Sequence, residues 1–170
     1  MLYQTIQSVP VERLDEPVVV CADLASTWRD LRRGVQAMLE QLASLAGRAV
    51  ALAMPFGPDW LAAAAALDRL ECQCFLLPAG LSRAEITRHA SQFQLAAILL
   101  DKQAMMPESP SADDRSAGSL HSAGRVVLLT SGTSGGPKAA MHTWASLASG
   151  IHVSGKLRGW RMLLSYDVAR

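Results

Sequence analysis

The segment Val127–Lys138, with the sequence VLLTSGTSGGPK, combines the residue types that bind phosphate groups. Its glycines let the backbone curl and approach closely, so that successive N–H groups face one anion. Its serine and threonine hydroxyls add donors, and Lys138 adds a positive charge. A strand is predicted over 125–130, and open α/β sheets bind ligands at the carboxyl ends of their strands. The sequence therefore predicts a phosphate-binding loop over 130–138.

Two common phosphate-binding loops do not fit this segment. A Walker A loop needs Gly-Lys followed by Ser or Thr, but Pro137 precedes Lys138 and Ala139 follows it. A dinucleotide fingerprint needs Gly-x-Gly-x-x-Gly at the start of a helix, and Pro137 interrupts the glycines here. Two alternatives stay open: a serine hydrolase, since Gly132–Gly136 (GTSGG) formally matches Gly-x-Ser-x-Gly around Ser134, and a polar turn that binds no ligand.

The cysteines and histidines predict neither disulfides nor a metal site. Cys21, Cys72 and Cys74 are odd in number, which argues against a disulfide framework, and the last two lie in an apolar run that predicts reduced, buried thiols. No Cys-x-x-Cys pair is present, and the histidines do not have helical metal-ligand spacing. These histidines are His89, His121, His142 and His152.

The composition is that of a globular chain without a nucleic-acid footprint. Of its 170 residues, 50% are apolar and 18% are charged, which suits one domain or part of a larger one. The net charge of +1 gives no basic patch for nucleic acid or acidic membranes. The N-terminus lacks the pattern of a secretory signal, and the apolar stretch at 60–67 is too short to span a bilayer. We therefore expect a cytoplasmic protein with no membrane span.

Strand and helix patterns alternate along the chain. The β-α-β-α order predicts an α/β fold with a parallel or mixed sheet and helices on both faces. A segment rich in Pro, Ser, Gly and Asp at 103–124 predicts a mobile surface loop or linker. The predicted strands are 17–22, 48–54, 72–78, 95–101, 125–130 and 161–167.

Helix boundaries are predicted from capping residues. Thr27 and Asp30 fit a capping box before a long helix that ends at Gly47, and Ser82 and Glu85 fit another before a helix reaching about Phe93. In the first of these helices one apolar face is expected to be buried, and Thr143 is a candidate N-cap for a last helix within 141–155. The residues of that face are Leu31, Val35, Met38, Leu42 and Leu45, and packing roles are expected for Trp28, Trp60, Trp144 and Trp160.

The stretch TSGTSGGPK at Thr130–Lys138 resembles the signature loop of the adenylate-forming superfamily. This superfamily contains acyl-CoA synthetases, aryl acid ligases, luciferases and the adenylation domains of nonribosomal peptide synthetases. Residues 26–78 are similar to its N-terminal region, where a TW/TY-x-x-L helix leads to a strand. The segment KAAMHTWASL resembles the family's KGVxxTHxxL, with Trp144 where many members have histidine. The likeness covers about residues 17–167, apart from 103–124.

The resemblance implies a two-step, ATP-dependent reaction. A carboxylic acid would become an acyl-adenylate, and the thiol of CoA or of a carrier protein's phosphopantetheine would then take the acyl group. The loop would hold the ATP phosphates, with Lys138 and Thr133 in catalytic roles and Mg²⁺ as a cofactor whose ligands lie outside this chain. The residues that the resemblance assigns to the phosphates are Thr130, Ser131, Gly132, Thr133, Ser134, Gly135, Gly136 and Lys138.

Members of this family are several hundred residues long, and their later motifs have no counterpart in this sequence. These motifs are the acid-pocket segments, a Thr-Glu pair that helps to bind magnesium, a ribose-binding aspartate, and a C-terminal domain with its adenylation lysine. Residues 1–170 are therefore expected to be an incomplete N-terminal AMP-binding domain that is inactive as a ligase alone. Its expected partners are the missing C-terminal part, a small carboxylic acid and an acyl or peptidyl carrier protein. A non-catalytic fragment or pseudo-enzyme is the further alternative.

Overall fold

The computed structural model describes residues 2–21, 24–101, 104–105, 125–130 and 138–149. Strands and helices alternate through them. The strands are β1 (Pro17–Cys21), β2 (Leu24–Thr27), β3 (Ala49–Leu52), β4 (Gln73–Leu76), β5 (Ala97–Leu99), β6 (Ala104–Met105), β7 (Arg125–Thr130) and β8 (Lys138–Thr143). The helices are α1 (Leu2–Gln7), α2 (Trp28–Leu42), α3 (Pro58–Arg69), α4 (Arg83–Gln92) and α5 (Trp144–Ala148), with short 3₁₀ helices η1 (Val11–Arg13) and η2 (Ala43–Leu45).

The main sheet of the described residues has the strand order β6-β5-β3-β4-β7-β8. Its four central strands, β5, β3, β4 and β7, are parallel, and the outer strands β6 and β8 pair antiparallel to their neighbours. The central strands are apolar on both faces, as strands covered on both sides should be. The predicted α/β class with a mixed sheet is confirmed.

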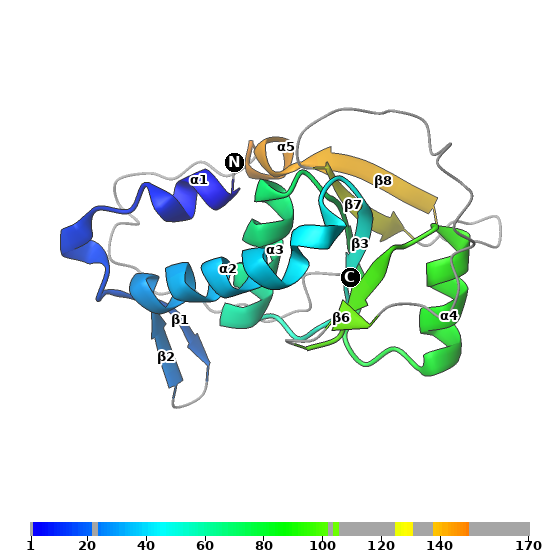
Figure 1. Ribbon diagram of the computed structural model, residues 1–170, viewed down its shortest axis with the longest axis horizontal. Coiled ribbons are helices and arrows are strands. Elements are labelled where there is room, and N and C mark those ends of the chain that lie inside the picture. Colours follow the sequence, from blue (N-terminus) through cyan, green and yellow to red (C-terminus); the bar gives the residue numbers. More distant parts are fainter. Residues whose placement is uncertain (1, 22–23, 102–103, 106–124, 131–137, 150–170) are drawn as a thin grey trace.

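Helices cover both faces of this sheet (Figure 1). On one face α2 and α3 pack against Val50, Leu52, Leu76 and Val126, and on the other α4 packs against residues such as Phe75 and Ile98. Successive residues of a strand point to opposite faces of the sheet, so a core on each face buries all of them. None of the helices in the described ranges is long and apolar enough to cross a bilayer.

The predicted capping boxes are present. At the start of α2 the Thr27 hydroxyl accepts from Asp30 N–H at 3.2 Å, and the Asp30 carboxylate accepts from Thr27 N–H at 3.1 Å. Ser82 and Glu85 make the same reciprocal pair before α4. Gly47 has φ +71°, the left-handed conformation that glycine adopts without steric cost. The predicted buried face of α2 and η2 is also confirmed at Leu31, Val35, Met38, Leu42 and Leu45.

The first predicted strand, 17–22, does not join the parallel sheet. Instead β1 pairs antiparallel with β2 in a separate two-stranded sheet beside the start of α2 (Figure 1). The reason is the short connection between them, because two residues can close a hairpin but a parallel pairing needs a crossover of a dozen residues or more. Strand β2 itself was not predicted.

Two more differences lie in the C-terminal third. Ala104–Met105 form the short strand β6 at the start of the predicted loop 103–124, and the rest of that loop is outside the described residues. Lys138–Thr143 form strand β8, so Met141–Thr143 belong to a strand and not to the last helix. That helix begins only at Trp144, and Thr143 is its N-cap as predicted. The strand predicted at 161–167 also lies outside the described residues.

Candidate functional site

The predicted phosphate-binding loop joins β7 to β8. Thr130 is the last residue of β7 and Lys138 the first of β8, and their Cα atoms are register partners. Residues 131–137, which contain Ser131, Gly132, Thr133, Ser134, Gly135 and Gly136, lie outside the described residues. The structure thus places the two ends of the loop side by side.

Strand β7 is positioned by the core on both of its faces. Val126 and Val127 are fully buried on opposite faces, and β7 pairs in parallel with β4 from Arg125 to Leu128. Thr130 follows that pairing by two residues. Since β3, β4, β5 and β7 are parallel, their carboxyl ends lie at one edge of the sheet, and the predicted loop begins at this edge.

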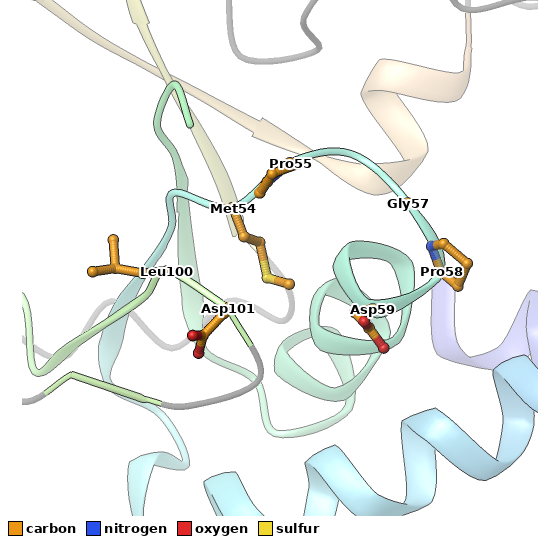
Figure 2. Close-up of a pocket in the computed structure, with 7 residues that line it drawn as sticks. All are labelled: Met54, Pro55, Gly57, Pro58, Asp59, Leu100 and Asp101. Carbon is orange, nitrogen blue, oxygen red and sulfur yellow. The ribbon is translucent and has the colours of Figure 1, made fainter. Parts of the chain in front are cut away.

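A cavity of about 250 Å³ opens at the same edge, beyond the ends of β3 and β5 (Figure 2). Met54 reaches between the end of the segment Leu100–Asp101 and the first turn of α3. The lining residues are Met54, Pro55, Gly57, Pro58, Asp59, Leu100 and Asp101. The charged side chains among them, Asp59 and Asp101, are acidic, so this cavity disfavours a phosphate. Sequence reasoning did not find it, because its walls come from two segments forty residues apart that carry no motif.

His89, Cys72 and Cys74 are buried in the core of the fold. His89 is buried on α4, where burial and the neighbouring Arg88 lower its pKa. Cys72 and Cys74 are buried as predicted, and burial raises the pKa of both thiols. The Cys72 thiol donates to the carbonyl of Leu45 at 3.1 Å. Within the described ranges no three His, Cys, Asp or Glu side chains are grouped as metal ligands would be.

Trp144 packs against other aromatic rings. Its ring meets that of Trp60 edge-on, with centroids 6.4 Å apart, and Trp60 lies against Phe56 at 5.3 Å. Trp60 is buried and Trp144 half-buried, which fits the predicted packing role of both. Trp160 lies outside the described residues.

Comparison with known proteins identifies the fold. No protein-family model and no curated protein matches the chain. Among solved structures, o-succinylbenzoate CoA synthetase (MenE) from Bacillus subtilis, in complex with the acyl-adenylate intermediate OSB-AMP, is 18% identical with a TM-score of 0.61, covering 91% of this chain and 47% of its own. The N-terminal subdomain of Klebsiella oxytoca NpsA, in complex with 3-hydroxyanthranilyl-AMSN, is 17% identical with a TM-score of 0.55, covering 82% of this chain and 39% of its own.

A third similar structure is the N-terminal domain of FACL13 from Mycobacterium tuberculosis, which is 19% identical with a TM-score of 0.59 and covers 84% of this chain and 43% of its own. This chain therefore spans less than half the length of these solved structures. All three show that its fold is that of the N-terminal part of adenylate-forming enzymes.

Proposed function

We propose that this chain, having the fold of the N-terminal part of adenylate-forming enzymes, supplies the ATP-phosphate-binding portion of an enzyme that converts a carboxylic acid to an acyl-adenylate. The observation that carries the proposal is the β7–β8 pair. It holds the ends of the segment TSGTSGGPK together, and the segment leaves β7 at the carboxyl edge of the parallel strands. That edge is where α/β sheets bind their ligands.

The chemistry explains what the loop has to do. A carboxylate oxygen attacks the α-phosphorus of ATP, the bond from that phosphorus to the bridging oxygen breaks, and pyrophosphate leaves with the charge. N–H and hydroxyl groups of Thr130–Gly136 would hold the β- and γ-phosphates as this charge gathers. Thr133 would donate its hydroxyl to the same oxygens, and Lys138 would neutralise them. The loop acts by positioning and charge stabilisation, without a protein nucleophile.

Two parts of the proposed reaction, the transfer of the acyl group to a thiol and the binding of Mg²⁺, need residues other than the described ones. The thiol of CoA or of a carrier-protein pantetheine would take the acyl group and release AMP. The resemblance to adenylate-forming enzymes implies that the Mg²⁺ ligands belong to other parts of the full-length enzyme. We further propose that the 170-residue chain has no ligase activity by itself.

The arrangement of elements disfavours the serine hydrolase alternative. A nucleophile elbow places its serine on a sharp turn from a strand directly into a helix. Among the described residues, the next element after β7 is strand β8, which begins four residues after Ser134. We therefore expect no labelling of Ser134 by a fluorophosphonate probe, and such labelling would favour the hydrolase.

Substitution of Lys138 tests the phosphate-binding role. We expect Lys138→Ala to weaken binding of ATP and of inorganic tripolyphosphate about tenfold, since a hydrogen bond to a charged group contributes about 1.5–3 kcal/mol and solvent screening reduces it. Affinity for AMP, which has no β- or γ-phosphate, should not change. Isothermal titration calorimetry of the chain measures all three constants.

The matched control is Arg48→Ala, which removes one exposed positive charge at the amino end of β3 and should leave all three constants unchanged. Equal ATP affinity in Lys138→Ala and wild type, or an equal loss for AMP, would contradict the phosphate-binding role. Acyl-hydroxamate formation by the 170-residue chain with ATP and a carboxylic acid tests the separate proposal of inactivity. Any product there shows that the chain suffices.

A further inference from the structure

Met141 lies on the exposed side of an edge strand. It is 58% exposed, whereas Met38 and Met54 are only 6% exposed. Its Cα partner across the β7–β8 pair is Val127, which belongs to the core on the α4 side of the sheet. Met141 is therefore largely exposed to solvent while its strand remains paired with β7.

Two nitrogen donors contact the Met141 sulfur. Gln73 Nε2, from β4, lies 3.8 Å from Sδ, and Arg125 Nη1, from β7, lies 3.9 Å from it. Gln73 and Arg125 are themselves Cα partners in the parallel pairing. Three adjacent strands thus bring an amide and a guanidinium to one exposed thioether, although thioether sulfur is only a weak acceptor.

We propose that Met141 is a site of reversible oxidation to methionine sulfoxide by a hydroperoxide. The sulfur lone pair attacks one peroxide oxygen, an S–O bond forms and the O–O bond breaks. The sulfur loses two electrons, and the other oxygen leaves as water or an alcohol after taking up a proton. Reduction by a dithiol reverses the step, yielding the thioether, a disulfide and water.

The two donors favour both the reaction and its product. As the O–O bond breaks, negative charge gathers on the leaving oxygen, and the Arg125 guanidinium beside the sulfur stabilises that charge. The sulfoxide oxygen is a much stronger acceptor than the thioether, so Arg125 and Gln73 gain a hydrogen-bond partner on oxidation. Oxidation of a buried methionine instead places a polar group in the core.

Oxidation of Met141 would affect how strand β8, which begins at Lys138, is attached to the sheet. A sulfoxide bonded to Gln73 and Arg125 ties β8 to β4 and β7 through side chains as well as through its backbone. Oxidation at Met141 therefore strengthens the attachment of this edge strand. The inference rests on residues outside the segment 131–137 and stands independently of the proposed function.

Oxidation rates test the first half of this inference. The folded chain is treated with hydrogen peroxide, and each methionine-containing peptide is followed by mass spectrometry. We expect Met141 to be oxidised at least about tenfold faster than Met38 and Met54, because oxidation follows exposure. Methionine sulfoxide reductases should restore the thioether. Equal rates at the three positions overturn the proposal.

The variant Arg125→Leu tests the role of the donors. We expect this variant to be oxidised more slowly at Met141. We also expect oxidation to lower the melting temperature of the variant, whereas oxidation of the wild type should leave its melting temperature unchanged or raise it. The control Arg33→Leu removes a positive charge from α2 and should behave as the wild type does. If Arg125→Leu changes neither the Met141 rate nor the response of the melting temperature, the assigned role of Arg125 is wrong. Should Arg125→Leu not fold, Gln73→Leu is compared in the same way.

Discussion

At the scale of single residues, the side chains around His89 determine which protonation state of its imidazole the folded chain favours. His89 is 8% exposed, its ring stacks on Phe93 with a centroid distance of 6.0 Å, and Phe93 in turn contacts Phe75 at 5.2 Å. Its Nδ1 is buried and has no hydrogen-bond partner among the described residues. Burial lowers the pKa of His89, Arg88 lowers it further, and Glu85 acts in the opposite direction. The folded chain therefore favours the neutral imidazole.

This preference predicts a pH dependence of stability. Above the ordinary pKa of 6.5 His89 is neutral in both states, and below it the unfolded chain takes up the proton first. The free energy of unfolding should therefore fall as the pH drops from about 7.5 to 5.5, and His89→Phe should flatten this dependence. Urea unfolding across this range measures it. An unchanged slope in His89→Phe contradicts the prediction.

At the scale of elements, two helices end in the same way, with a non-glycine residue in the left-handed conformation. Glu71 after α3 has φ 56° and Gln94 after α4 has φ 50°. Behind α3, Cys72 N–H donates to the carbonyl of Leu67 at 2.9 Å, and behind α4, Leu95 N–H donates to that of Ala90 at 2.9 Å. These are Schellman motifs, in which glycine is the usual residue at the left-handed position. Each motif directs the chain from a helix to the next buried strand, and the left-handed conformation of a non-glycine residue makes this turn sterically unfavourable.

Replacement of Gln94 measures that cost. Relief of the left-handed strain contributes about 1–2 kcal/mol, and the greater freedom of glycine in the unfolded chain offsets about 0.4–1 kcal/mol of it. We expect Gln94→Gly to stabilise the fold by about 0.5–1 kcal/mol in urea unfolding. Gln94→Ala removes the same exposed side chain but keeps Cβ, so it should give no gain. Equal effects of the two substitutions would falsify the strain argument.

At the scale of the whole molecule, the sheet separates two cores. Cys72 and Cys74 both belong to the core beneath α2 and α3, and each is 1% exposed. Since the thiolate is the reactive form, burial and a raised pKa both make these thiols inert in the folded state. Their reactivity therefore reports on opening of this core.

Thiol labelling tests whether that core opens only on unfolding. In a Cys21→Ser background, which leaves Cys72 and Cys74 as the thiols, labelling by a maleimide should be slow under native conditions. The rate should rise in parallel with the loss of helical circular dichroism as urea is added, because access then requires unfolding. Fast labelling of the native chain would show that the core opens locally.

The sequence alone determined what depends on near neighbours in the chain. The capping pairs Thr27–Asp30 and Ser82–Glu85 formed as predicted, because a cap needs only residues three positions apart. The buried face of α2 and the four central parallel strands were likewise predicted, since hydrophobic periodicity is a local pattern. Local patterns also placed the segment 130–138 at the end of β7, and phosphate binding by this segment stays a prediction.

Only the tertiary structure decided which segments meet. It paired β1 with β2 outside the main sheet, and it made Lys138–Thr143 an edge strand, because strand pairing depends on tertiary context more than on the propensity of one segment. It also brought Gln73 and Arg125 to the sulfur of Met141, and Met54 to the cavity beside Asp101. No pattern within one segment encodes these contacts, because each depends on the order of strands across the sheet.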